Sequence, residues 1–260
     1  MSRAMGRGIA DIGAGRLALL NQGAIASATL TEGLAIDFAV LLEAAVPAIG
    51  AARLDQLRAQ ADAGITRRMA LAARLLLDAG ADLAPLQAHP SDTVRGWACF
   101  AIAAQAGLDL PRQLAAMRPL ADDGHFGVRE WAWLALRPRL AANLMDAIAL
   151  LAPWTAEPSE RLRRFACEAL RPRGVWCAHI TELKQQPQLA LPLLQPLRAD
   201  PALYVQDAVA NWLNDAAKSQ PGWVRALCAQ WLEESGNAAT LRICKRARRS
   251  LAELPVDLPA

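Results

Sequence analysis

The chain has 260 residues, of which 54% are hydrophobic and 20% charged, and its formal net charge is +3. This composition excludes a disordered chain, and the length allows one large domain or two small ones. No run of 18 uncharged apolar residues occurs, so no membrane span is expected. Because alanine and leucine are abundant and β-branched and aromatic residues are few, the composition favours helix nearly everywhere.

Cysteine and histidine usage argues against several kinds of site. The five cysteines form no Cys-x-x-Cys pair, which indicates reduced structural thiols in a cytoplasmic protein. The three histidines are scattered (His89, His125 and His179), so neither a histidine-based metal site nor a Ser-His-Asp triad is predicted. We therefore expect a cytoplasmic monomer that uses no metal, no cofactor and no membrane.

The N-terminal third of the chain predicts short helices. Residues 1–23 are interpreted as a leader with weak order. Two short helical patterns follow between residues 24 and 48, with Thr31 and Glu32 near a helix start. Residues 51–63 and 65–79 predict a helix pair, and Gly80 is expected to end the second helix as a C-cap.

A five-residue motif, V-R-x-x-A, recurs from residue 94 onward. Its copies begin 34, 34, 43 and 38 residues apart, at Val94, Val128, Leu162, Val205 and, in degenerate form, Ile243. Shorter helical stretches lie between the copies. A two-helix repeat of this length is typical of an α-solenoid, and the motif favours HEAT-like units. We therefore predict an all-α superhelix of HEAT-like repeats, forming a single domain over residues 24–260, with a longer loop at residues 174–188.

The third copy lies in the amphipathic helical stretch SERLRRFACEALRPRGVW, at residues 159–176. Helical spacing places its apolar side chains on one side and gathers four charged ones on the other, namely Arg161, Arg164, Glu168 and Arg171. One interpretation is an ordinary solvated face with i,i+4 ion pairs. Because stacked repeats align equivalent positions, the alternative is a charged groove to which the next unit adds Asn211 and Asp215.

The tryptophans are candidate contacts to a substrate. Eight tryptophans stand against one tyrosine and four phenylalanines. Trp176 follows an Arg-Pro-Arg turn outside the apolar face of its helix, so it is the best candidate for an exposed ring. Trp131 and Trp133 point 200° apart on one helix, so at least one of them must leave the core. A ring held near carboxylates attracts a cation or the C–H groups of a sugar.

Arginine usage indicates a possible phosphate partner. Only three of the 28 basic residues are lysine, and the arginine fork suits phosphate recognition, although a GC-rich coding bias explains the ratio equally well. Six arginines at helix ends and near the C-terminus are candidate contacts to a DNA backbone: Arg137, Arg139, Arg171, Arg173, Arg246 and Arg249. Solvated charges at the rim of the solenoid are the alternative.

The sequence resembles the AlkC/AlkD-type HEAT-like repeat DNA alkylation repair glycosylases, and most of all their AlkC branch. The resemblance rests on LRRFACEALRPRGVW (162–176), on YVQDAVANWLNDAAKSQPGWV (204–224) with ICKRARRSL (243–251), and on LTEGLAIDF (30–38). It implies a DNA glycosylase that holds duplex DNA in a concave basic groove. Its implied substrates are cationic N-alkylated purines such as 3-methyladenine.

The resemblance also implies roles for particular residues. By matching position, Glu168 and Asp215 are implied to be the acids that face the lesion, and Trp176 is implied to pack on its deoxyribose. Arg164 resembles the arginine that clamps a phosphate, and Asn211 resembles the groove residue opposite it.

The preceding repeat departs from the family pattern. Trp133 occupies the place of an expected carboxylate, and the nearest acid is Glu130, which is therefore a third catalytic candidate. Two other functions stay open: a non-catalytic relative that binds damaged or branched DNA, and a HEAT-repeat scaffold that binds protein. The glycosylase interpretation requires Glu168, Asp215 and Trp176 to meet in a shared hollow.

Overall fold

The computed structural model describes residues 8–251, which form sixteen α-helices and four 3-10 helices and contain no strand. The chain divides into two compact units, residues 1–136 and 137–260. Helix α9 (Phe126–Ala142) runs across the boundary between them. The single domain expected over residues 24–260 stays a prediction beside this division.

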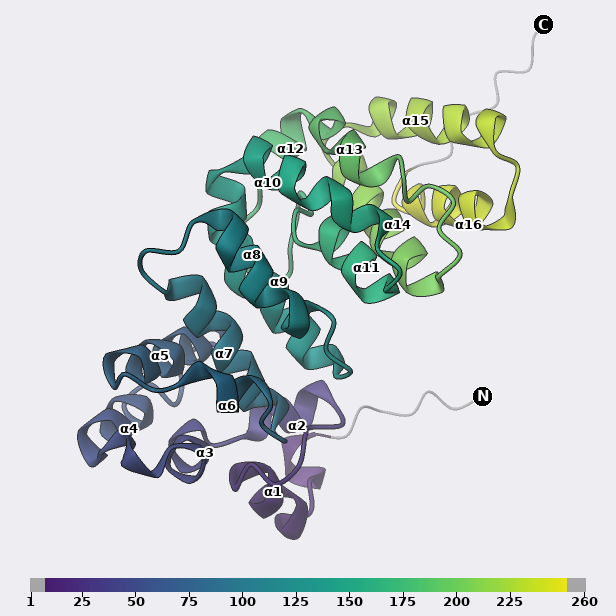
Figure 1. Cartoon of the computed structure of the whole chain (residues 1–260). Coiled ribbons are helices and arrows are strands. Elements are labelled where there is room, and N and C mark those ends of the chain that lie inside the picture. Colours follow the sequence, from purple (N-terminus) through teal and green to yellow (C-terminus); the bar gives the residue numbers. More distant parts are fainter. Residues whose placement is uncertain (1–7, 252–260) are drawn as a thin grey trace, which may run out of the picture. The chain divides into compact units, whose positions relative to one another are not determined.

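The N-terminal unit consists of short helices that pack against one another (Figure 1). Before α9 its α-helices are α1 (Ala14–Asn21), α2 (Leu30–Ala35), α3 (Phe38–Ala45), α4 (Ala51–Arg58), α5 (Ile65–Asp78), α6 (Leu83–Gln87), α7 (Asp92–Ala104) and α8 (Leu110–Ala121). Two 3-10 helices, Ile9–Asp11 and Pro47–Ile49, complete the unit. Helix α5 packs against α7, and α3 packs against α4.

Helix α5 illustrates how local sequence produces these elements. Met69, Ala72, Ala73 and Leu76 recur at i, i+3, i+4 and i+7, and all four are buried. The helix ends where Gly80 adopts a φ of +66°, a left-handed conformation that glycine adopts without steric cost. The predicted C-cap at Gly80 is therefore confirmed.

Part of the expected leader is helical. Within residues 1–23 the structure describes residues 8–23, which contain the first 3-10 helix and α1. Leu20 of α1 is completely buried, and α1 packs against α3. Residues 1–7 of the predicted leader lie outside the described residues.

Glu32 in α2 joins this helix to α1 and to the segment that precedes α2. Its carboxylate accepts hydrogen bonds from Arg16 Nη2 at 2.7 Å and from the Ala28 backbone nitrogen at 2.6 Å. The hydrogen bond from Arg16 is the largest cause that lowers the pKa of Glu32, from 4.5 to about 2. The ionised form of Glu32 therefore stabilises the folded unit.

This depressed pKa predicts a loss of stability in acid. A carboxyl group with a lowered folded pKa contributes its full stability above the unfolded pKa, and this contribution disappears as the pH falls from about 4.5 to about 2. Glu32→Gln removes the contribution, so we expect the difference in unfolding free energy between wild type and variant to shrink over that pH range. Urea unfolding followed by circular dichroism measures this difference, and Glu43→Gln, at an exposed position, is the control. A difference that does not vary with pH would contradict the assignment.

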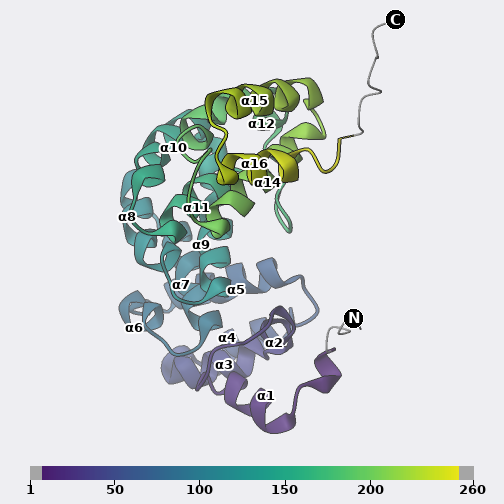
Figure 2. The same cartoon turned by 90° about the vertical axis from the view of Figure 1, so that its right-hand side faces the viewer.

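The C-terminal unit is centred on a long helix, α14 (Leu203–Ala217). Its other α-helices are α10 (Leu144–Leu151), α11 (Glu160–Glu168), α12 (Thr181–Gln185), α13 (Leu191–Leu194), α15 (Pro221–Glu234) and α16 (Ala238–Ala247), with 3-10 helices at Ala152–Ala156 and Pro187–Ala190. Helix α14 packs against both α11 and α16, and α15 packs against α14 and α16 (Figure 2). Helix α14, which carries Asp215, thereby packs between α11, which carries Glu168, and α16, which carries Arg246.

The repeated motif marks the buried face of one helix in each repeat. Its five copies lie in α7, α9, α11, α14 and α16. The first and fifth positions of every copy are buried: Val94 and Ala98, Val128 and Ala132, Leu162 and Ala166, Val205 and Val209, Ile243 and Ala247. An apolar pair at i and i+4 faces the core, which explains why these positions recur. The predicted all-α repeat pattern is therefore present within both units.

The arginine of the motif has a structural task. In the first four copies the side chain at the second position donates to the carbonyls six and five residues earlier: Arg95 to His89 and Pro90, Arg129 to Asp123 and Gly124, Arg163 to Glu157 and Pro158, Gln206 to Asp200 and Pro201. These bonds satisfy carbonyls in the turn that leads into each helix. They account for the recurrence of a long donor side chain at this position.

The predicted long loop at residues 174–188 is partly wrong, because α12 occupies residues 181–185. Ile180 and Leu183 are buried, so this segment has an apolar side that packs against α14. Polar side chains between and after these two residues, namely Thr181, Glu182, Lys184 and Gln185, had masked this short amphipathic pattern.

Candidate functional site in the C-terminal unit

The candidate site begins where α11 ends. Glu168 is the last residue of α11, and Pro172 follows shortly afterwards, where it offers no backbone N–H and disfavours helical geometry at the residue before it. The chain then makes a loop over residues 169–180, which we call the α11 loop, before it enters α12. This loop carries three of the predicted residues, Arg171, Arg173 and Trp176.

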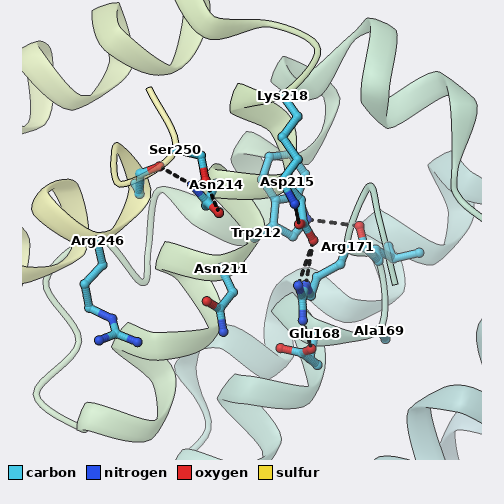
Figure 3. Close-up of polar contacts among 12 residues, drawn as sticks. Glu168, Ala169, Arg171, Asn211, Trp212, Asn214, Asp215, Lys218, Arg246 and Ser250 are labelled. Atoms are coloured by element: carbon cyan, nitrogen blue, oxygen red, sulfur yellow. Dashed lines mark hydrogen bonds and ion pairs between the residues drawn. The ribbon is translucent and has the colours of Figure 1, made fainter. Parts of the chain in front are cut away.

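Arg171 joins the two predicted catalytic carboxylates (Figure 3). Its Nη1 donates to Glu168 Oε1 at 2.7 Å, and its Nη2 and Nε donate to Asp215 Oδ2 at 2.7 and 3.0 Å. Both carboxylates are nearly buried, with 3% and 4% of their surface exposed. Burial lowers the pKa of Arg171, but the carboxylates of Glu168 and Asp215 outweigh it and raise the pKa above its usual value. The structure thus brings Glu168 and Asp215 together through one guanidinium group.

Two further cations approach these carboxylates. Lys218 Nζ lies 3.3 Å from Asp215 Oδ1, and Arg164 Nη2 lies 3.8 Å from Glu168 Oε2. The Arg164 guanidinium also stacks over the Tyr204 ring, 4.4 Å from its centroid. Two carboxylates are therefore matched by three cations, including Arg171. Lys218 and Tyr204 were not predicted, although Lys218 stands three residues after Asp215 on the same helix face.

Asn211 lies beside this cluster on α14, and two of the predicted arginines follow it in the chain, Arg246 on α16 and Arg249 just after α16 ends. Asn211 is one helical turn before Asp215 on α14 and accepts a hydrogen bond from Arg249 Nη2 at 2.9 Å. Arg246 pairs with Asp207, with Nε 3.1 Å from Oδ1. Burial is the largest cause that lowers the pKa of Arg249, and the neighbouring Arg246 guanidinium lowers it further.

Trp176 is the exposed ring that the sequence predicted, with 50% of its surface exposed. Val175 beside it is 62% exposed. Trp176 has a φ of +62°, which is uncommon for any residue other than glycine. The exposure of Trp176 is thus confirmed, whereas a shared hollow with Glu168 and Asp215 stays a prediction.

The other arginines predicted to contact DNA differ in their surroundings. Arg137 is only 2% exposed, and its guanidinium donates to backbone carbonyls, so its side chain lies in the interior rather than on a DNA-facing surface. Arg173 is partly exposed and donates from Nη2 to Ser219 Oγ at 2.7 Å. Arg139 is partly exposed near the end of α9.

Three predicted residues lie in the N-terminal unit on α9. Trp133 is 4% exposed and donates from Nε1 to Glu130 Oε2 at 2.9 Å. Trp131 is partly exposed and packs against Phe100, with 6.1 Å between ring centroids. Trp133 is therefore a core residue in this structure and not a surface for a substrate, whereas Trp131 and Glu130 keep partial exposure.

Residues 8–251 contain neither a metal-binding cluster nor a membrane-spanning helix. No group of three histidine, cysteine or acidic side chains in this range is arranged to hold a metal ion. Within the same range, no helix has the length and apolar character needed to cross a membrane.

Comparison with solved structures shows to which proteins the whole chain is similar. The chain is similar to the alkylpurine DNA glycosylase AlkC of Pseudomonas fluorescens, solved bound to DNA containing an abasic site analogue, with a TM-score of 0.68 and 26% identity. The match covers 95% of this chain and 65% of that protein, so the chain spans less than two thirds of the length of AlkC. The resemblance inferred from the sequence is thereby confirmed at the level of structure.

More distant structures share the fold. AlkD2 of Streptococcus mutans has a TM-score of 0.56 at 20% identity, over 82% of this chain and 97% of that one. The protein smu.31 of S. mutans UA159 has a TM-score of 0.55 at 20% identity, over 77% and 92%. An uncharacterised Bacillus subtilis (strain 168) protein, YhaZ, is 43% identical over 56 residues, which are 22% of this chain and 16% of YhaZ. No protein-family profile matches the chain.

Proposed function

The chain has the all-α, HEAT-like repeat fold of the AlkC/AlkD-type DNA alkylation repair glycosylases, and from this premise we propose that it is a DNA glycosylase. Its proposed substrates are cationic N-alkylated purines of the 3-methyladenine type in duplex DNA. The observation that carries the proposal is the pair of nearly buried carboxylates, Glu168 and Asp215, that α11 and α14 hold together through Arg171.

These carboxylates suit cleavage of an N-glycosidic bond. As the base leaves, positive charge develops on the sugar, and a carboxylate near C1′ stabilises that charge and orients the attacking water. An alkylated purine already carries a positive charge, so it leaves without a general acid. Glu168 and Asp215 supply the carboxylates, and Glu130 is proposed as a third acid.

The basic and aromatic side chains suit a DNA duplex. Arg164 lies beside Glu168, Arg249 bonds to Asn211 one helical turn before Asp215, and Arg246 pairs with Asp207, and these guanidinium groups are proposed as phosphate contacts. Arg139 and Arg173 are proposed as further phosphate contacts. Trp176 is proposed to pack on the deoxyribose of the lesion, and Trp131 is a second candidate ring.

The same cluster favours a second candidate function, a non-catalytic protein that binds damaged or branched DNA. Arg171, Lys218 and Arg164 together offset the negative charge of Glu168 and Asp215. A cationic lesion gains less from carboxylates that are already paired than from free ones. DNA binding through arginines requires no such free carboxylates.

Release of 3-methyladenine from methylated duplex DNA separates these candidates. We expect wild-type protein to release the base and to shift DNA in a gel, with a shift that weakens as salt is added. A salt-sensitive shift without release would establish the non-catalytic binder. If the protein neither releases the base nor shifts DNA, the protein-binding scaffold is the remaining interpretation.

A further inference from the structure

The end of α11 is closed by side chains from two other helices. The last carbonyls of a helix have no partner within it. Here Arg137 Nη1 donates to the Ala169 carbonyl at 2.9 Å and Arg137 Nη2 donates to the Arg171 carbonyl at 2.6 Å, while Trp212 Nε1 donates to the Leu170 carbonyl at 3.0 Å. Three consecutive carbonyls at the start of the α11 loop are therefore satisfied from outside the loop.

The same guanidinium reaches the returning part of the loop. Arg137 Nε and Nη2 lie 3.3 and 3.2 Å from the Ala178 carbonyl, and a backbone hydrogen bond of 3.1 Å joins Ile180 to Pro172. Burial lowers the pKa of Arg137, but arginine stays charged, and the carbonyl dipoles at the end of α11 are a favourable setting for a cation. One buried guanidinium thus bonds both arms of the α11 loop.

The tip between these arms is exposed and strained. Val175 and Trp176 point to solvent, and Trp176 keeps a left-handed backbone. Such a conformation persists only where the surrounding structure determines it. Gly174 packs so closely on the Cys177 sulfur that a side chain at residue 174 would collide with it, and the Arg137 guanidinium lies at van der Waals distance, 3.5 Å from the position of such a Cβ atom. The backbone conformation of the tip is therefore set on the buried side of the loop, where Arg137 lies.

We propose that Arg137 is a positioning residue that fixes the α11 loop and so holds the Trp176 ring ready for DNA. The inference rests on the proposed function for the role of Trp176, but the ordering of the loop is independent of it. The Arg171 side chain has its own anchors in Glu168 and Asp215, so Trp176 is the residue that depends on Arg137. Arg137 acts through the loop and makes no contact with DNA itself.

Limited proteolysis tests the ordering of the loop without any activity measurement. Trypsin cleaves after arginine unless proline follows, so the Arg173–Gly174 bond is cleavable and the Arg171–Pro172 bond is not. We expect wild type to resist cleavage after Arg173, and Arg137→Met and Arg137→Lys to be cut there first. Arg112→Met removes an exposed arginine from α8 and is the control for the charge change. If Arg137→Met fails to fold, Arg137→Lys, which retains the charge, decides the outcome.

Excision kinetics test the connection to Trp176. We expect Arg137→Lys to lower kcat for base release about tenfold, while the circular dichroism spectrum stays native and Arg112→Met stays unchanged. In a Trp176→Ala background the same substitution should lower kcat no more than about twofold, because residues that act through each other are not additive. A full tenfold loss in that background, or a loop that stays resistant to trypsin in Arg137→Lys, would overturn the proposal. If wild type releases no base, proteolysis still decides the loop ordering and the proposed function alone fails.

Discussion

Glu168→Gln and Asp215→Asn are each expected to lower base release about 10²- to 10³-fold, which is the usual effect of removing one group that stabilises transition-state charge. Each substitution keeps the shape of the side chain but removes the negative charge that we propose to lie beside the sugar. The arginines proposed to bind DNA stay in place, so DNA affinity should change by no more than about threefold. Single-turnover release of 3-methyladenine and a gel shift with the same duplex measure the two quantities.

One control variant and two contrary outcomes test this prediction. Glu182→Gln replaces an exposed acid on α12, outside the cluster, and should leave both release and affinity unchanged. If Glu168→Gln and Asp215→Asn lower affinity as much as release, the carboxylates support the structure of the DNA-binding surface. If neither changes release, the two acids are not catalytic.

Arg171→Met is expected to lower the free energy of unfolding by about 3–5 kcal/mol, because it leaves two nearly buried carboxylates without their shared partner. Lys218, 3.3 Å from Asp215, and Arg164, 3.8 Å from Glu168, leave each carboxylate with one more distant cation. Adding Glu168→Gln and Asp215→Asn to this variant should restore most of the loss, since no buried charge is then left unpaired. Urea unfolding of the three proteins measures both effects.

Arg246→Met is the control for the loss of an arginine ion pair. Arg246 and its partner Asp207 are 43% and 40% exposed, so water screens their pairing and the expected cost is below about 1 kcal/mol. If Arg171→Met costs no more than Arg246→Met, the carboxylates are reached by water or neutralised in another way. The bridge would then be a minor contact and not the centre of the site.

The predictions that held were those that depend on local sequence. The recurrence of apolar residues at i and i+4 identified the helix of each repeat, because burial of one helix face requires that spacing in any context. Gly80 ends α5, and Trp176 stands exposed after a proline turn. Each of these features is set by the conformational preferences of a few consecutive residues.

The partners that the long charged side chains bind depended on the tertiary structure. Arg137 and Arg171 occupy the same position in successive copies of the motif, and both were predicted to contact DNA. Arg137 instead donates to the Ala169 carbonyl at the end of α11, and Arg171 bridges Glu168 and Asp215. A flexible guanidinium binds whichever carbonyl or carboxylate the next repeat brings within reach, and the sequence of its own helix does not specify that partner. The sequence by itself determined the helices, their repeat and their buried faces, whereas only the packing of one repeat on the next decided which arginines face solvent and which hold the site together.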